Sequence, residues 1–321
     1  MSLGLISRTQ LTVQKRISLD SLPMRATDLA VVPRIRSRQI GETDLPKVAD
    51  FLARGFPKKP REFWAGLLRF LSERSAPSEL PRYGYLLENG DRVVGAVLLL
   101  FSTVPGSAKI RCNVSSWFVE EGFRSYASLL VSKALSRRDV TYLNITPAPH
   151  TLPIITAQGF LPYSRGVFVA LAAMQSSRSR VRVSPRTTLP RERGRVRVGV
   201  CELEPFEQSV LDDHAKFGCM SLCCEAPDGT YPFVFRPRLI KRIPCAQLVY
   251  CRSLDHFVRC AGPIGRFLLL RGRPFVLIDA DGPIRGLLGR YFPGRMPKYF
   301  KGPDRPRLGD LAYTETAMFG M

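Results

Sequence analysis

The amino-acid sequence predicts an α/β fold of the α+β kind, with a mixed, mostly antiparallel sheet flanked by helices. Two observations lead to this fold class. Three strand-like segments between residues 82 and 119 follow one another without a helix, and helical and strand-like patterns alternate on either side of them. A regularly alternating series of the Rossmann type is excluded, because it has no three consecutive strands.

The first segments are a strand and two amphipathic helices. Residues 34–40 (RIRSRQI) set isoleucines among polar residues, which is typical of a strand. The segment GETDLPKVADFLARGF follows, and its apolar residues recur on one helical face. We expect Thr43 to be its N-cap and Gly55 to end it. A second helix, REFWAGLLRFL, is predicted to end near Ser72.

The next segments are the three consecutive strands. RYGYLLENGDRVVGAVLLLF holds two strands around Asn89 and Gly90, and Asn-Gly is a strong hairpin signal. KIRCNVSSWFV is the third strand. Beyond it the sequence predicts a helix to about Leu135, the strand VTYLNIT, a short helix that ends at Gly159, and the strand GVFVALAA.

The second half of the chain repeats this order in a weaker form. RVRVGVCELEPFEQSVLDDHAKFG predicts a strand and a helix, and MSLCCEAPDGTYPFVF predicts two strands around a turn. CAQLVYC, RSLDHFVRCAGPIGRFLLL and PFVLIDADGP predict a strand, a helix and a strand. The shared order predicts a tandem duplication. An offset of 135 residues pairs Arg124 with Arg259, Ala127 with Gly262 and Asn144 with Asp279.

These elements divide the chain into four predicted regions. Residues 1–30 form a flexible basic tail, 31–174 the first domain and 196–321 the degenerate second domain. Residues 175–195 are rich in Arg, Ser and Pro, and we expect an extended, solvated linker. The alternative is an arginine-rich arm that binds RNA or anionic lipid.

The N-terminal tail carries Ser and Arg but almost no acids. This composition is typical of a transit peptide, of a frayed basic tail, and of a chain whose true start is Met24. The sequence leaves these alternatives open. No apolar h-region indicates secretion, and no apolar run reaches the roughly 18 to 20 residues of a membrane span. The expected location is therefore the cytoplasm.

The net charge of +21 has two interpretations. An arginine-rich genome would produce a solvated basic surface, whereas a polyanion such as nucleic acid, an anionic membrane or a phosphorylated cofactor would exploit the charge. The eight cysteines stand mainly in apolar runs, so we expect buried free thiols in a reducing compartment. His214 precedes Cys219 and Cys223, but without a CxxC pair we expect no metal site.

One junction has the pattern of a phosphate site. In SSWFVEEGFRSYASLLVSKAL, a strand passes into a helix with little chain between them. The first amides of a helix are unpaired and carry partial positive charge. Small residues there let a diphosphate approach the backbone. Arg124 would flank such a site, and Ser125, Ala127 and Ser128 are small.

With this junction and the order of elements, residues 33–172 resemble the GCN5-related N-acetyltransferase (GNAT) superfamily. The segments that carry the resemblance are RIRSRQIGETDLPKVADFLARGF, WFVEEGFRSYASLLVSKAL and TYLNITPAPHTLPIITAQGF. The resemblance implies acyl transfer from acyl-CoA or acetyl-CoA as co-substrate. It also implies that pantetheine lies between the splayed fourth and fifth strands. The resemblance extends to residues 195–321 only through the repeat.

The family's binding residues carry over to the junction. Trp117, Phe118 and Val119 would line the pantetheine. The backbone amides of Arg124, Ser125, Tyr126, Ala127 and Ser128 would hold the diphosphate. The sequence departs from the family pattern at Ala127 and Leu129, where glycine or another small residue is usual, and at Ile155, where many members have a tyrosine general acid.

Three places in the sequence offer candidates for the missing acid or base. His150 stands near the predicted splay, and its ordinary pKa suits proton transfer. Glu120, with Glu121 beside it, follows the fourth strand and could deprotonate an amine. Tyr126 is the third candidate. Each has a structural alternative, since a loop histidine and surface acids opposite an arginine are common.

The second half offers an alternative donor site. VRCAGPIGRF holds Arg259 and Gly262 at the spacing of the family motif, with Pro263 acceptable at a first helical position. Close packing of a helix explains the same glycines. We expect the donor at the first junction.

Three functions follow from these observations. The first is an acyl-CoA-dependent transferase acting on an amine or hydroxyl of a small molecule or peptide. The second is a tandem GNAT enzyme that takes its acyl group from aminoacyl-tRNA, for which the arginine excess is suited. The third is a non-catalytic GNAT-fold binding module, for which Ala127, Leu129 and Ile155 are arguments. The oligomeric state is left open.

Overall fold

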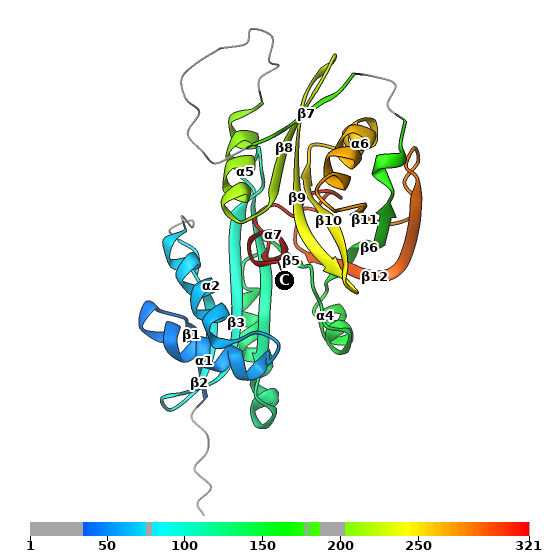
Figure 1. Cartoon of the computed structure of the whole chain (residues 1–321). Coiled ribbons are helices and arrows are strands. Elements are labelled where there is room, and N and C mark those ends of the chain that lie inside the picture. Colours follow the sequence, from blue (N-terminus) through cyan, green and yellow to red (C-terminus); the bar gives the residue numbers. More distant parts are fainter. Residues whose placement is uncertain (1–34, 75–78, 177–179, 187–202, 321) are drawn as a thin grey trace, which may run out of the picture. The chain divides into compact units, whose positions relative to one another are not determined.

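The computed structural model describes residues 35–74, 79–176, 180–186 and 203–320 (Figure 1). The predicted basic tail and the strand predicted around residues 195–200 lie outside the described residues. Among the described residues, no helix is both long and apolar enough to cross a lipid bilayer.

Within the described residues, 12 strands join one sheet in the order β1-β2-β3-β4-β5-β12-β6-β11-β10-β9-β8-β7. Only β4 with β5 and β10 with β11 pair in parallel, so the sheet is mixed and mostly antiparallel, as predicted. The strands are β1 Ile35–Gln39, β2 Gly84–Asn89, β3 Arg92–Thr103, β4 Ile110–Val119, β5 Thr141–Asn144, β6 Leu161–Ala170, β7 Arg182–Pro185, β8 Met220–Ala226, β9 Gly229–Ile240, β10 Ile243–Cys251, β11 Phe275–Ala280 and β12 Gly289–Lys301.

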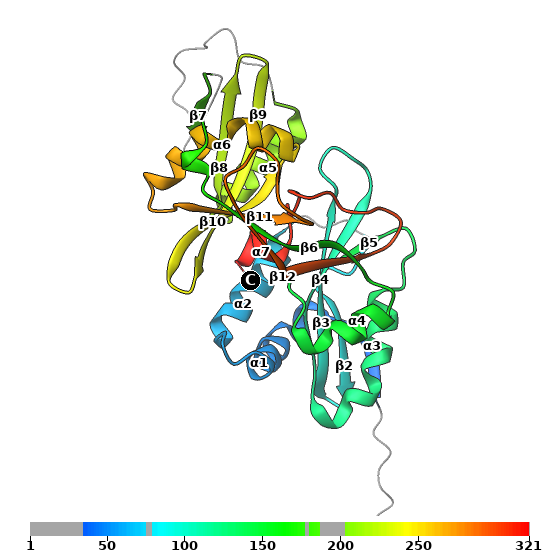
Figure 2. The same ribbon diagram turned by 90° about the vertical axis from the view of Figure 1, so that its right-hand side faces the viewer.

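Helices cover both faces of the sheet. β3 is buried along almost its whole length, because its alternate residues enter two cores. Leu98 packs in the core of α1 and α2, and Leu99 packs in the core of α3 and α4 on the opposite face (Figure 2). The α-helices are α1 Leu45–Gly55, α2 Arg61–Glu73, α3 Ala127–Ala134, α4 Leu152–Ala157, α5 Pro205–Lys216, α6 Leu254–Leu269 and α7 Glu315–Phe319; the 3-10 helices are η1 Glu42–Asp44, η2 Glu121–Tyr126, η3 Pro149–Thr151 and η4 Ala172–Met174.

The start of the first helix differs from the prediction. Thr43 is not an N-cap, because it lies inside η1, the turn that precedes α1. The carboxylate of Asp44 accepts a hydrogen bond from the Gly41 amide at 2.8 Å and ion-pairs with Arg38. The predicted end at Gly55 and the hairpin at Gly90 are confirmed.

The two halves of the chain exchange strands. β12, from the second half, lies between β5 and β6 of the first. Its residues Tyr299–Lys301 pair with β5, and Gly289–Pro293 pair with β6. The other edge of β6 pairs with β11. One continuous sheet therefore includes strands of both predicted domains, and the domain boundaries stay predictions.

Part of the predicted linker is structured. Arg182–Pro185 form the edge strand β7, which pairs antiparallel with β8. The expectation of a wholly solvated tract is therefore wrong for these residues. Alternate apolar residues explain the difference, because Val183 packs against the core beneath α6.

The second half repeats the pairing pattern of the first. β8, β9 and β10 are antiparallel neighbours and β11 is parallel to β10, as β2, β3, β4 and β5 are. The helix after β10 differs. α6 begins at Leu254 after Ser253, whose side chain accepts a hydrogen bond from the His256 amide at 3.2 Å.

The predicted second junction at Arg259, Gly262 and Pro263 is therefore wrong, because all three residues lie inside α6. The glycine instead permits close packing, as the alternative interpretation held. A Cβ atom on Gly262 would lie 2.3 Å from the carbonyl oxygen of Gln175. Arg259 ion-pairs with Asp228.

A C-terminal segment, residues 307–320, connects the two halves. Asp310 is 4% exposed and forms an ion pair with buried Arg111 of β4, with an Nη1–Oδ2 distance of 3.1 Å. Arg111 also donates a hydrogen bond to the Ala312 carbonyl at 2.6 Å. Buried pairs of this kind fix geometry, since loss of one partner leaves an uncompensated charge.

His214 of α5 is fully buried against the same segment. Its Nδ1 lies 2.7 Å from the Val210 carbonyl, and its Nε2 accepts a hydrogen bond from the Tyr313 amide at 3.0 Å. Burial lowers the pKa of His214 to about 4. Both ring nitrogens thus contact backbone groups. The described cysteines carry free thiols, mostly buried, as predicted.

Candidate active site

In the first half of the chain, the parallel strands β4 and β5 separate after a short paired stretch. The two strands pair only over Arg111–Asn113 and Thr141–Leu143. Beyond Asn113, a register shift against β3 inserts an extra residue into β4. Ser116 lies in this bulge with a φ of 52°, a left-handed conformation that non-glycine residues seldom adopt. Such strained positions gather at functional sites.

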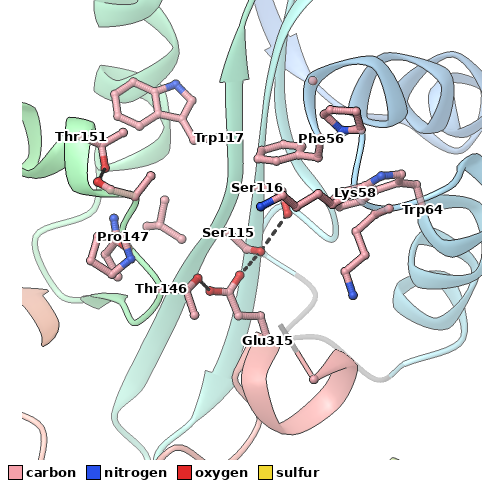
Figure 3. A pocket seen from close by; sticks show the side chains of 17 residues that line it. Phe56, Lys58, Trp64, Ser115, Ser116, Trp117, Thr146, Pro147, Thr151 and Glu315 are labelled. Carbon is pink, nitrogen blue, oxygen red and sulfur yellow. Dashed lines mark hydrogen bonds between the residues drawn. The ribbon is translucent and has the colours of Figure 1, made fainter. Parts of the chain in front are cut away.

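A cleft of about 480 Å³ opens beside this bulge (Figure 3). It lies between the loop that joins α1 to α2, the end of β4, the segment after β5, and α7. This volume suits a small-molecule ligand. The cleft is lined by Gly55, Phe56, Pro57, Lys58, Lys59, Trp64, Val114, Ser115, Ser116, Trp117, Asn144, Thr146, Pro147, Ala148, Thr151, Glu315 and Gly320.

A smaller cavity of about 20 Å³ lies on the α3 and α4 face of the same opening. Val131 of α3 and Ile155 of α4 contribute to its wall. Val114, Trp117 and Asn144 line both cavities. The opening between β4 and β5 is therefore bordered by space on both faces of the sheet.

Glu315 is the carboxylate of the cleft. It is 2% exposed, and its two carboxylate oxygens accept hydrogen bonds from the hydroxyls of Ser115 and Thr146 (Figure 3). Its own amide donates to the side-chain oxygen of Asn113 at 2.7 Å. Burial raises the pKa of Glu315 above the ordinary glutamate value, while the two hydroxyl donors oppose that rise.

The walls of the cleft combine aromatic rings with polar donors. Trp64 is 1% exposed, and its ring packs against Phe56 at a centroid distance of 5.4 Å. The indole N–H groups of Trp64 and Trp117 are buried without a hydrogen-bond partner among the described residues. Lys58 and Lys59 stand on the loop side. A buried donor without a partner is costly, so a ligand acceptor would compensate these groups.

The residues predicted to line the pantetheine are divided. Trp117 lines both cavities. Phe118 points to the α1 side, where its ring lies 5.2 Å from that of Phe51. Val119 belongs to the core of α3 and α4. Their alternation along β4 explains this division.

The predicted diphosphate junction is exposed. Arg124, Ser125 and Ser128 are exposed, and the guanidinium of Arg124 lies 3.9 Å from Glu121. Tyr126 and Ala127 are half-buried against the α3 core, and α3 begins at Ala127. Leu129, the bulky departure from the motif, is 45% exposed and thus does not enter the core. The diphosphate role of this junction stays a prediction.

The three predicted catalytic residues do not line the cleft. His150 is exposed in η3, next to Thr151, which does line it. Glu120 forms ion pairs with Arg92 and Arg54. Tyr126 packs in the core of α3 and α4. Their catalytic roles stay predictions.

Sequence reasoning missed Glu315. It lies 200 residues from Ser115 in the chain, so no local spacing connects them. Its segment, AYTETAMFG, has a weak signal: an acid inside an otherwise uncharged run. An acid in such a run is often buried and paired, which would have marked it for attention.

Comparisons with known proteins agree on the fold. Models of known families and curated proteins give no match to the sequence. A GCN5-related N-acetyltransferase from Kribbella flavida superposes with a TM-score of 0.51 at 15% identity, over 83% of this chain and 70% of that one. One from Anabaena variabilis gives a TM-score of 0.52 at 10% identity, over 83% and 72%. The chain has the GNAT fold, as the sequence resemblance predicts, and the agreement extends over both halves.

Proposed function

We propose that the protein is an acyltransferase that moves an acyl group from acyl-CoA to an amine or hydroxyl acceptor held in the cleft. The separation of β4 and β5 carries this proposal. It adjoins space on both faces of the sheet, so donor and acceptor can approach each other from opposite sides. Alignment of two reactants in this way removes much of the entropic barrier to transfer.

The donor is expected on the α3 and α4 face. Pantetheine would lie along the free edge of β4 beyond Asn113, where pairing with β5 has ended. Trp117 is the predicted pantetheine residue that adjoins both cavities. The diphosphate would reach the start of α3 near Arg124, in the position that the family resemblance implies. The small cavity must widen for this, and side chains such as Val131 border it.

The acceptor is expected on the α1 and α2 face, beside Glu315. In the transfer, a bond forms between the acceptor nitrogen and the thioester carbon, and the carbon–sulfur bond breaks. The nitrogen gives a proton to the Glu315 carboxylate, and the departing CoA thiolate takes one from solvent. A carboxylate with a raised pKa is a stronger base than an exposed one, which suits this role.

The test is a titration with CoA and acetyl-CoA by calorimetry, together with an assay for CoA thiol release. We expect saturable binding in the wild type, weaker binding in Ala127→Trp and Arg124→Ala, and thiol release with amine acceptors. Absence of binding at millimolar CoA would contradict the proposal and favour the non-catalytic module. Steeply salt-dependent tRNA binding without CoA binding would favour the aminoacyl-tRNA enzyme.

A further inference from the structure

We propose that the acceptor is an amino-acid-like zwitterion: a small primary amine that also carries a carboxylate and an apolar side chain. This inference rests on the proposed function for the transfer step, but the anion-binding part stands independently. Four observations of the cleft support it.

The first observation is the charge arrangement. Glu315 supplies the carboxylate of the cleft lining, and Lys58 and Lys59 supply two ammonium groups on the loop between α1 and α2. Among the described residues, neither lysine has an acid partner; Lys59 lies over the ring of Phe63 at 4.4 Å. A ligand with an ammonium and a carboxylate complements both charges, with its amine toward Glu315.

The second observation is the pair of buried donors. The indole N–H groups of Trp64 and Trp117 have no partner among the described residues, although both side chains line the cleft. An indole N–H can only donate, so the missing partner must be a hydrogen-bond acceptor. Carboxylate oxygens are strong acceptors and match the lysines as well.

The third observation is the apolar wall. Phe56, Trp64 and Trp117 present aromatic surface, and Pro147 lies on the side after β5 (Figure 3). Ala148 lines the cleft next to Pro147. Burial of such surface favours an acceptor with an apolar side chain over a wholly polar one.

The fourth observation is the volume of about 480 Å³, which suits a free small molecule.

The test compares three amines that share one apolar body: L-phenylalanine, L-phenylalaninamide and phenethylamine. Each is assayed with acetyl-CoA for thiol release. We expect the highest kcat/KM for L-phenylalanine. O-phosphoethanolamine is a fourth substrate, and a preference for it would overturn the choice of carboxylate over phosphate.

Variants identify the groups that recognise the anion. Lys58→Gln combined with Lys59→Gln should raise KM for L-phenylalanine roughly tenfold and leave phenethylamine unchanged. Trp64→Phe should raise the KM for L-phenylalanine about fivefold, because it removes one hydrogen-bond donor. Lys47→Gln, an exposed lysine of α1 outside the cleft lining, is the matched control and should change neither value.

A binding measurement separates the two proposals. N-acetyl-L-phenylalanine and N-acetylphenethylamine are titrated by calorimetry without any CoA. Tighter binding of the carboxylate, lost in the double lysine variant, supports the anion site even if no thiol is released; the proposed transferase activity would then fail alone. Transfer to phenethylamine with no preference for the carboxylate in either assay would overturn this inference and leave the transferase proposal intact.

Discussion

The openings between β4 and β5 and between β10 and β11 start alike and end differently. Each parallel pair joins over three residues on each strand and then stops. Beyond that point the first opening adjoins the cleft. In the second, residues 309–311 run along β10: the Cys251 amide donates to the Gly309 carbonyl at 2.9 Å, and the Leu311 amide donates to the Val249 carbonyl at 2.7 Å.

This difference indicates which half of the chain can bind a ligand along the edge of a strand. β9 pairs with the opposite edge of β10, so residues 309–311 take the edge that faces β11. The second half satisfies its backbone with its own chain, whereas the first half leaves the edge of β4 beyond Asn113 unpaired with β5. We therefore expect the proposed donor to bind in the first half.

The largest expected effect is at the open site. Glu315→Gln keeps the shape of the side chain but removes the base, so we expect kcat to fall about 100- to 10,000-fold. In the wild type, kcat should rise with pH through the raised pKa of Glu315, because the ionised form is the base. That rise should disappear in the variant.

Steady-state kinetics from pH 5 to 9 check this prediction. Glu121→Gln, at a side chain 89% exposed, is the matched control and should keep the wild-type rate. If Glu120→Gln lowered kcat as strongly and Glu315→Gln did not, the carboxylate predicted from the sequence would be the base instead.

The second prediction concerns the buried ion pair between Arg111 of β4 and Asp310 of the C-terminal segment. Arg111→Met leaves buried Asp310 with Arg307, at 3.7 Å, as its remaining cation, so the free energy of unfolding should fall by up to about 3–5 kcal/mol. Urea denaturation measures the change. Lys109→Met removes an exposed ion pair with Asp304 and should cost no more than about 1 kcal/mol. Equal losses of unfolding free energy in the two variants would show that the buried ion pair contributes no more to stability than the exposed one.

The third prediction concerns pH and the same segment. In the native state His214 is neutral, because its pKa is lowered to about 4. Its contribution to the free energy of unfolding is therefore fully present above pH 6.5, the ordinary pKa of histidine. As pH falls from 6.5 to 4, about 3 kcal/mol of stability should be lost. Protonated Nε2 can no longer accept the Tyr313 amide.

Urea denaturation at several pH values measures this loss. The difference between wild type and His214→Gln isolates the contribution of the residue from that of other groups. His150→Gln, at an exposed histidine, is the matched substitution control. A parallel pH profile for His214→Gln and the wild type would refute the assignment.

The fourth prediction concerns the opening between β10 and β11, which residues 309–311 occupy. Gly309 has a φ of 76°, and a Cβ atom there would lie 2.6 Å from the sulfur of Cys251. Gly309→Ala should therefore destabilise the fold by about 2 kcal/mol. Gly122→Ala, where nothing lies within 4 Å and φ is not positive, should change stability by less than about 0.5 kcal/mol. Thermal unfolding compares the two.

The smallest effect is expected at the exposed junction of the first half. Arg124→Ala should weaken CoA binding about two- to fivefold, because an exposed arginine contributes little to a screened phosphate. Arg259→Ala, its partner in the 135-residue overlay, should leave CoA affinity unchanged, since Arg259 lies inside α6. Calorimetry of both variants decides the point. A larger loss in Arg259→Ala would move the donor to the second half.

Local signals in the sequence predicted most of the first half of the fold. Gly55 ends α1 as expected, Gly90 makes the hairpin between β2 and β3, and the long apolar run of β3 is buried on both faces. Each of these features depends on neighbouring residues, so sequence patterns contain the information.

Long-range features could not be predicted in this way. The insertion of β12 between β5 and β6 depends on pairing across more than a hundred residues. Glu315 reaches the cleft for the same reason. The misplaced second junction was avoidable, because Ser253 is a good N-cap residue and indicates that the helix starts before Arg259.

The position of β12 has a consequence for biosynthesis. During translation, β5 and β6 leave the ribosome well before the strand that must lie between them, so both keep an unsatisfied edge until residues 289–301 emerge. Such edges invite wrong pairing, and distant contacts form slowly. Nascent chains stopped before residue 289 should therefore require chaperones, and the two halves should not fold as separately expressed fragments.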